Sequence, residues 1–186
     1  KNESMVCIKN AKQSDFGEGV LLMSVLDKAG KCGLYCGACP FYLGTKDPEY
    51  KKQFKQENGK WEEEWYCLGC GNLDDKSWGN DCTITQCVVS KSATHCHTCD
   101  DYPCEKLIQF SNDEYSHHHT VISGSNRMKE VGCDTWVKEQ ETRWACTECG
   151  KPFAWYAKTC MNCGKKVFNS VEEDKEKTDK TERSKS

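Results

Sequence analysis

The sequence has few of the large apolar side chains that normally build a hydrophobic core. Leu, Ile, Val and Phe together make only 28 of its 186 residues. Such a composition is typical of disordered proteins when the net charge is large, but here the formal net charge is only −3. Cysteine is abundant instead, with 16 residues. We expect metal–thiolate bonds to replace much of the missing core. The binding free energy of a structural zinc, about 10–16 kcal/mol, also counts as folding free energy.

Long apolar runs and an excess of charge of one sign are also missing. No stretch approaches the roughly 20 apolar residues of a membrane span. The segment GVLLMSVL, residues 19–26, lacks the basic run and the cleavage site of a signal peptide. The 26 basic and 29 acidic residues nearly balance, which argues against a domain-wide basic surface for nucleic acid. We expect a cytoplasmic protein with reduced thiols and no membrane partner.

Two copies of C-x-x-C-G stand near the C-terminus, and ten residues separate the two C-x-x-C pairs. The expected metal ligands of this segment are Cys146, Cys149, Cys160 and Cys163. Each pair suits a tight turn in which Gly150 or Gly164 accepts a positive φ and backbone amides point at the sulfurs. Two such turns at the ends of a small hairpin make a tetrahedral four-sulfur site. The spacing therefore predicts a zinc ribbon over residues 144–168, holding one zinc ion.

Ten further cysteines occupy the N-terminal half of the chain. They are Cys32, Cys36, Cys39, Cys67, Cys70, Cys82, Cys87, Cys96, Cys99 and Cys104. Two four-ligand sites would use eight of them, so we expect two zinc ions here and two spare thiols, which gives three zinc ions in all. Iron–sulfur clusters also take cysteines at C-x-x-C spacing, so a 4Fe–4S cluster is the alternative. The sequence leaves open which eight cysteines bind and how they group.

The stretch CGLYCGACPFY, residues 32–42, has the C-x-x-x-C-x-x-C spacing of radical enzymes that cleave S-adenosylmethionine. Such enzymes need a large partial barrel, and this chain shows neither βαβ alternation nor a glycine-rich segment for the methionine. The residue before the third cysteine is usually aromatic in that class, whereas here it is Ala38. No Ser-His-Asp arrangement, phosphate loop or suitably placed carboxylate pair is present either. We therefore favour a binding protein over an enzyme.

Four cysteine motifs together resemble a bacterial and archaeal cysteine-rich family of unknown function. They are CGLYCGACPFY, CLGCG, the C-x4-C of Cys82 and Cys87, and CHTCDDYPCEKL. Members of that family are similar in showing C-G-L-x-C-x-x-C near the start and C-x-x-C-x-x-aromatic-P-C-x-x-L near the end. The resemblance covers about residues 32–110, and residues 127–160 look like an extension of members that end in a zinc ribbon. It implies a zinc-binding or otherwise metal-binding domain and no established reaction.

These observations predict the fold class and the order of the domains. We expect a small metal-stabilised α+β or irregular cysteine-rich domain with short helices at residues 32–110, and a zinc-ribbon β-hairpin at 144–168. An N-terminal extension at 1–31, partly disordered, precedes them, and a helical connector at 111–143 joins them. The charged, apolar-poor residues 169–186 are expected to form a disordered tail.

Local patterns predict several of the helices. Asp47 can cap a helix, Pro48 suits its first turn, and Gly59 can end it. The segment DCTITQCVVSKSA predicts a short helix or a turn, and YPCEKLIQF predicts another helix. The segments TVISGSNRMKEVG and CDTWVKEQETRW predict two short helices around Gly132.

We interpret the protein as a zinc-binding structural or adaptor module, with another protein as its partner. The alternative is an iron–sulfur protein in electron transfer or in redox or metal sensing. A nucleic-acid-binding ribbon and an enzyme that uses a spare thiol are less favoured. Lysines near the last four cysteines make that segment locally basic, but lysines on a small knuckle are common for solubility alone.

Overall fold

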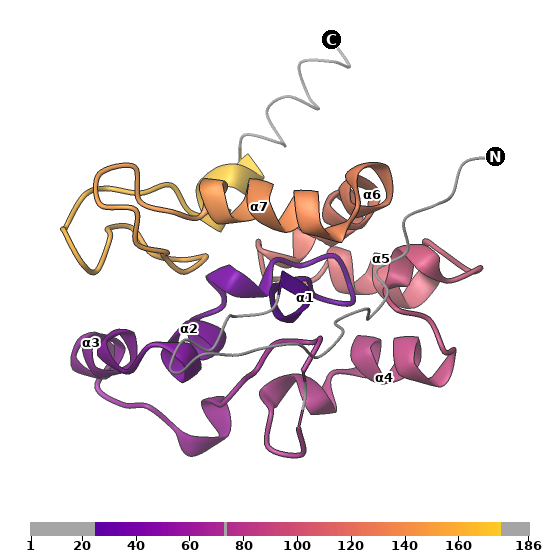
Figure 1. The fold of residues 1–186 in the computed structure, drawn as a ribbon, viewed down its shortest axis with the longest axis horizontal. Coiled ribbons are helices and arrows are strands. Elements are labelled where there is room, and N and C mark those ends of the chain that lie inside the picture. The colour runs from indigo at the N-terminus through magenta and orange to yellow at the C-terminus, as the bar shows by residue number, and fades with distance from the viewer. Residues whose placement is uncertain (1–24, 73, 176–186) are drawn as a thin grey trace, which may run out of the picture.

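The computed structural model describes residues 25–72 and 74–175. The expectations for residues 1–24, including Cys7, and for residues 176–186 lie outside this part. The described chain begins with α1 (Val25–Lys28), which lies between two groups of helices (Figure 1). On one side are α6 (Val121–Val131) and α7 (Cys133–Arg143), and on the other are α2 (Pro40–Lys46), α3 (Pro48–Asn58) and α4 (Thr83–Ser90). The remaining helices are α5 (Glu105–Ser111), the 3₁₀ turns η1 (Cys36–Ala38), η2 (Glu63–Trp65), η3 (Trp78–Asp81), η4 (Cys96–Thr98) and η5 (His118–Thr120), and residues 170–175.

The predicted fold class is wrong, because the described residues are mostly helical and form no sheet. Their β pairing is limited to isolated bridges, Ala29 with Tyr35, Ala145 with Pro152 and Thr159 with Lys166. The hairpin expected at residues 144–168 does not form a β-ladder, because Trp155 in its middle makes its backbone hydrogen bonds with residues outside the hairpin. The N–H of Trp155 donates to the carbonyl oxygen of Ala38 at 3.1 Å, and its own carbonyl accepts from Ser170 at 2.7 Å. Backbone groups used in this way are not available for strand pairing.

The helices predicted from local signals are confirmed. Asp47 Oδ1 accepts from the N–H groups of Glu49 and Tyr50 at 2.9 and 3.3 Å, which caps α3. The helix ends at Gly59, whose φ is +79°. Gly132, with φ +81°, separates α6 from α7. These boundaries depend on side chains and glycines within a few positions, and the sequence alone was therefore enough to predict them.

Two clusters of buried side chains make up the core. The first joins the segment after α1, helices α6 and α7, and the residues after α7; it contains Ala29, Tyr35, Ala38, Met128, Cys133, Trp136, Val137, Trp144, Cys146, Phe153, Trp155, Cys160 and Val167. The second contains Cys32, Ile84, Val88, Cys96, Leu107 and Val121. Leu34 packs against both clusters. Cysteines are thus part of the packed interior, as the shortage of aliphatic residues requires.

Aromatic side chains form a third, half-buried cluster around α2, α3 and η2. Its members are Phe41, Phe54, Trp61, Trp65 and Trp78. Phe41 stacks on Trp65 with ring centroids 5.3 Å apart, and Phe54 meets Trp61 edge to face at 5.5 Å. Aromatic pairs at such distances contribute about 0.5–1.5 kcal/mol beyond their burial. This cluster supports a part of the chain that holds few aliphatic residues.

The backbone of Gly33 lies directly against α6. Gly33 has φ +97°, and a Cβ there would lie 2.2 Å from the carbonyl oxygen of Val121. On the facing helix, a Cβ on Gly124 would lie 2.2 Å from the carbonyl oxygen of Gly33. Ser125 Oγ donates to the carbonyl oxygen of Cys32 at 3.0 Å in the same contact. Helix α6 approaches the backbone of Gly33 this closely only because neither Gly33 nor Gly124 has a side chain.

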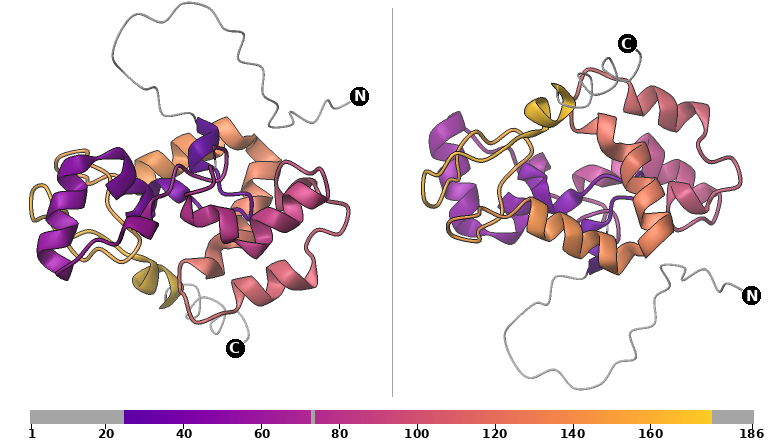
Figure 2. Two further views of the ribbon diagram at one scale, coloured as in Figure 1. Left: turned by 90° about the horizontal axis from the view of Figure 1, so that it is seen from below. Right: turned by 90° about the horizontal axis from the view of Figure 1, so that it is seen from above.

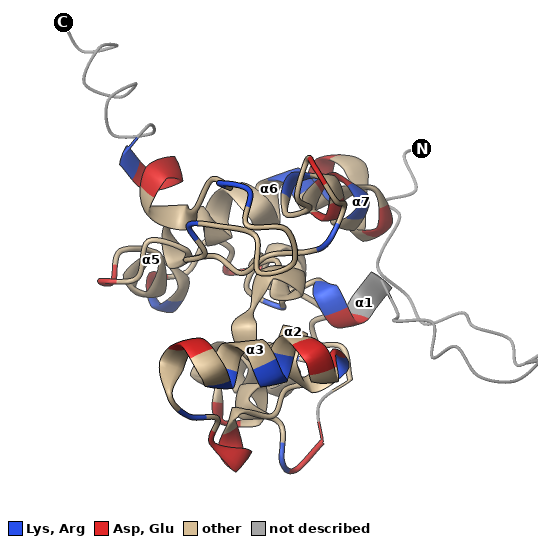
Figure 3. Ribbon diagram, turned by 90° about the vertical axis from the view of Figure 1, so that its left-hand side faces the viewer, with Lys and Arg blue, Asp and Glu red and all other residues tan. Residues whose placement is uncertain are grey.

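The remaining features of the fold are the position of residues 144–168 and the distribution of charged residues. Residues 144–168 occupy the end of the molecule that also holds α2 and α3 (Figure 2). Acidic and basic residues alternate along α3 and α7 and are not gathered on separate faces (Figure 3). Within the described chain, no helix combines the length and apolarity that crossing a membrane requires.

We expect Gly33→Ala to destabilise the protein strongly. The new methyl group meets backbone and Ser125 atoms, and φ is unfavourable, so we expect a loss of about 3 kcal/mol or more in urea unfolding. Gly59→Ala is the matched control, because Gly59 also has positive φ but has nothing within 4 Å of the added Cβ. Its loss should stay near 1–2 kcal/mol, the cost of backbone strain alone. Equal losses in the two variants would contradict the close contact.

Candidate metal centre

Four sulfur atoms converge in residues 144–168, which we call the four-cysteine module. All four Sγ atoms lie within 4.8 Å of one another, and they belong to Cys146, Cys149, Cys160 and Cys163. The Sγ atoms of Cys146 and Cys163 are 3.6 Å apart, and so are those of Cys149 and Cys160. Four sulfurs bound to one zinc ion at about 2.3 Å in a tetrahedron stand roughly 3.8 Å apart. The prediction that these cysteines form a possible metal site is confirmed, and their spacing suits a single ion.

Each half of this site is one tight turn, and the two turns are built alike. In the first, the N–H of Gly150 donates to the carbonyl oxygen of Cys146 at 2.8 Å, and the N–H of Cys146 donates to that of Lys151 at 2.9 Å. The second turn, residues 160–165, repeats these bonds at 2.8 and 2.7 Å. The glycines have φ of +72° and +73°, values that strain any other residue. The repeated C-x-x-C-G sequence therefore produces two equivalent halves of one site.

The turns also favour the ionised form of at least one ligand. The backbone N–H of Lys151, together with the side chain of Asn162, lowers the pKa of Cys149 to about 6. Metals bind the thiolate and not the thiol. Desolvation and the neighbouring sulfurs, Cys149 among them, raise the pKa of Cys163, so Cys149 ionises more easily than Cys163.

The module is fastened to the rest of the protein through Trp155. Its N–H bonds to Ala38, and its indole stacks on the imidazole of His117 with centroids 4.1 Å apart and planes 21° apart. His117 Nδ1 lies 2.7 Å from the hydroxyl of Tyr156. Burial lowers the pKa of His117 to about 3, so the ring is neutral at physiological pH. The sequence did not reveal this contact, because a histidine tract before a helix resembles any exposed helix start.

The first residues of the predicted tail take part in the same contact. Ser170, which is 1% exposed, donates its N–H to the carbonyl oxygen of Trp155. Asn169 Oδ1 accepts from the N–H groups of Val171 and Glu172, both at 3.1 Å, and so caps the helix at residues 170–175. Residues 169–175 therefore cover part of the module.

The ten N-terminal cysteines lie mainly at the ends of short helices. Cys36 begins η1 and Cys39 caps α2; Cys82 caps α4, which contains Cys87; Cys96 begins η4, Cys99 ends it, and Cys104 caps α5. Cys32 precedes η1, and Cys67 and Cys70 lie in the loop after η2. Across residues 25–72 and 74–175, no second set of three Cys, His, Asp or Glu ligand atoms lies within 4.8 Å. The structure therefore gathers only four of the fourteen predicted ligands at single-ion spacing.

The N-terminal cysteines nevertheless fall into two neighbourhoods. A hydrogen bond with Cys70, then burial, then the charges of Cys70, Cys67 and Cys39 raise the pKa of Cys36 well above its usual value. We call Cys36, Cys39, Cys67 and Cys70 the first cysteine group.

The second neighbourhood surrounds Cys96. Burial, followed by the charges of Cys104, Cys87 and Cys99, raises the pKa of Cys96 to about 12. Cys82 is a further neighbour of Cys96. Cys32 adjoins both groups, since the thiols of Cys70, Cys82 and Cys96 all help to raise its pKa, after burial. Mutual repulsion of this kind is what a bound metal ion would relieve.

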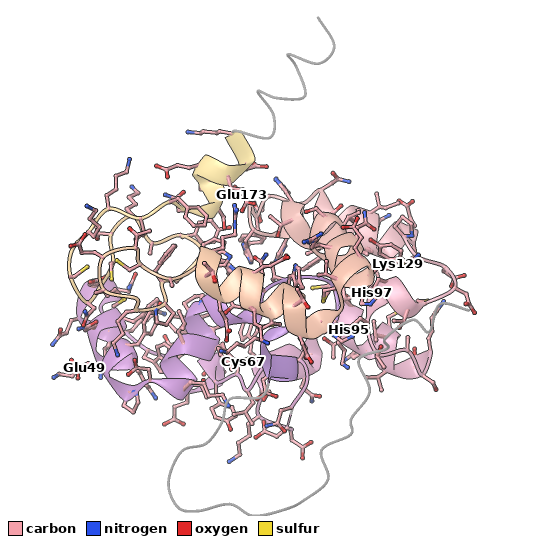
Figure 4. All side chains as sticks on the ribbon, turned by 45° about the horizontal axis from the view of Figure 1, so that its top comes forward. Glu49, Cys67, His95, His97, Lys129 and Glu173 are labelled. Atoms are coloured by element: carbon pink, nitrogen blue, oxygen red, sulfur yellow. The ribbon has the colours of Figure 1, made fainter. Side chains whose placement is uncertain are left out.

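His95 and His97 flank Cys96 but point to a different part of the interior. His95 is buried, stacks on His97 with centroids 5.4 Å apart, and places Nε2 at 4.0 Å from the sulfur of Cys133. His97 lies near Lys129, close to the junction of α6 and α7 (Figure 4). Burial, and then the charges of His97 and Lys31, lower the pKa of His95 to about 4.

Comparison with known proteins identifies one relationship. Residues 28–109 match a family described as "Protein of unknown function (DUF3795)". The matched segment contains all ten N-terminal cysteines and supports the resemblance to a cysteine-rich family of unknown function. The four-cysteine module lies outside it. No curated protein and no solved structure matches the chain.

We expect Trp155→Ala to weaken the attachment of the module. Trp155 is 7% exposed and contacts His117, so removal of its ring should cost about 3–5 kcal/mol in urea unfolding. Trp78→Ala is the control, because Trp78 is 54% exposed and makes an edge contact with Phe41. We expect a loss of about 1 kcal/mol for this control. If the two variants lost the same stability, Trp155 would not be the anchor of the module.

Proposed function

We propose that the protein is a structural metal-binding protein whose four-cysteine module holds one zinc ion. The observation that carries the proposal is the sulfur spacing of 3.6 Å, close to the edge of a tetrahedron around one ion. Four thiolates complete the coordination of zinc and leave no open position for a substrate or a water molecule. A site of this kind stabilises structure and does not catalyse a reaction.

The surroundings of the site support a structural role. Cys146 and Cys160 are both 2% exposed and pack in the same core cluster as Tyr35, Ala38 and Trp136. An ion that joins these two sulfurs therefore also joins the module to the segment after α1. Single-ion iron is the chemical competitor, since it accepts the same four ligands. The short spacer between the two turns and the small surrounding core favour zinc.

We also propose that the protein acts as an adaptor that contacts another protein. Aromatic side chains remain on the surface of the folded chain, among them Trp78, Tyr115 and Tyr156, which are 54%, 49% and 44% exposed. Aromatic residues are enriched in the centres of protein interfaces. The alternating charges of α3 and α7 favour a protein partner over nucleic acid (Figure 3).

Cys160→Ser should remove one zinc ion per chain and lower the thermal stability of the protein. A serine hydroxyl is a poor substitute for a thiolate, and the three remaining sulfurs leave the ion open to exchange. Metal analysis after gel filtration, together with the melting temperature, measures both effects. Thr147→Ala is the control, since Thr147 lies in the first turn of the same module, is exposed and supplies no thiolate. Full zinc content in Cys160→Ser would argue against the site.

A further inference from the structure

A cavity of about 200 Å³ lies where five parts of the chain meet. Its walls come from the segment after α1, the region of η5 and α6, helix α7, the four-cysteine module and the helix at residues 170–175. Figure 4 labels Glu173, which belongs to the wall formed by that last helix. The cavity is therefore complete only when the module and the last helix are docked against α6 and α7.

Buried aromatic rings make up much of the lining. Tyr35, Trp136, Trp144 and Trp155 all line the cavity, and all four are buried. Tyr35 meets Trp136 edge to face with ring centroids 6.1 Å apart, so these two rings hold each other in position. Aromatic walls with a few polar groups among them are typical of small-molecule sites. The flat faces of such rings favour a planar ligand.

The charged groups of the lining are already compensated. Arg127 makes two hydrogen bonds to Glu139, at 3.1 and 2.6 Å, and one to Glu130 at 3.2 Å. Arg143 forms an ion pair of 2.9 Å with Glu173. A charged ligand would have to compete with one of these pairs, whereas a neutral ligand leaves both in place. We therefore expect a ligand without net charge.

Two polar side chains of the lining have no hydrogen-bond partner. The hydroxyl of Ser170 is buried, and it bonds to no other group among the described residues. The side-chain amide of Gln140, on α7, also has no partner in this part of the chain. A buried polar group without a hydrogen bond is unfavourable, so a bound molecule that supplies the partner gains affinity. Because an amide both donates and accepts, the matching ligand carries a donor and an acceptor.

The volume of the cavity limits the ligand to a small ring system. An apolar cavity of roughly 150 Å³ holds one benzene molecule. At about 200 Å³ this cavity has room for a slightly larger molecule, with two fused rings of about nine atoms in all. It is too small for the drug-sized ligands that occupy pockets of about 300–1,000 Å³.

We propose that this cavity binds a neutral, planar nitrogen heterocycle that has both a hydrogen-bond donor and an acceptor. The aromatic rings contact the faces of the ligand, and the hydroxyl of Ser170 and the amide of Gln140 bond to its nitrogen atoms. The proposal goes beyond the structural metal site. It requires the module to be docked but does not depend on which metal the module holds.

The test measures the binding of benzimidazole to the full chain. This molecule has two fused rings, is uncharged at neutral pH, and carries one N–H donor and one acceptor nitrogen. Indene is the control ligand, because it has the same shape and no nitrogen. Titration calorimetry should show one benzimidazole site per chain, with weaker binding of indene. The NMR signal of the indole N–H of Trp136 should shift when benzimidazole binds.

Two variants test the polar contacts. Ser170→Ala should bind benzimidazole about fivefold more weakly, the effect of one hydrogen bond, and indene as before. Its melting temperature should not fall, because the hydroxyl makes no bond in the unliganded protein. Gln140→Leu should likewise weaken the binding of benzimidazole alone. Ser90→Ala, which changes an exposed serine of α4 outside the cavity, is the control and should bind both ligands like the wild type. Failure of the wild type to bind benzimidazole, an unmoved Trp136 signal, unchanged benzimidazole affinity in both variants, or equal losses for the two ligands would overturn the proposal.

Discussion

The carbonyl and Cα of Gly33 lie so close to α6 that neither Gly33 nor Gly124 has room for a side chain. This contact fixes the position of residues 29–39, the segment on which the rest of the structure depends. The residues that follow Gly33 in this segment contact different parts of the protein. Leu34 packs against both core clusters, Tyr35 meets Trp136 edge to face, and Ala38 accepts the hydrogen bond of the module. One short segment therefore contacts both core clusters and the four-cysteine module.

A chain with so little aliphatic bulk needs other means of filling its interior. The structure uses aromatic rings around α2 and α3, and it includes five cysteine side chains in the core clusters, namely Cys32, Cys96, Cys133, Cys146 and Cys160. A small domain buries too little apolar surface to be stable by packing alone. Metal–thiolate bonds at the proposed zinc site would supply the difference, because ligand binding to the folded state adds directly to its stability. The shortage of aliphatic residues and the pattern of cysteines thus have one physical explanation.

The sequence predicted those features whose causes are local. Asp47 and Gly59 set the ends of α3, and the repeated C-x-x-C-G motif set the two turns of the module. The β-hairpin prediction was wrong because the hydrogen bonds of Trp155 go to Ala38 and Ser170, which no rule about neighbouring residues could anticipate. The grouping of the ten N-terminal cysteines was open for the same reason. It depends on how the loop at Cys67 meets η1, and this is a property of the folded chain.

Ala38 links the segment that holds Cys36 and Cys39 to the four-cysteine module. Ala38, which is 0% exposed, lies between Cys36 and Cys39, and its carbonyl oxygen accepts the N–H of Trp155. A metal centre that fixed Cys36 and Cys39 would also fix the direction in which the carbonyl group of Ala38 points. The module in turn presents Trp155 to Ala38 only while its own four sulfurs hold the two turns together. The proposed zinc ion would therefore stabilise the contact between the module and the segment that holds Cys36 and Cys39.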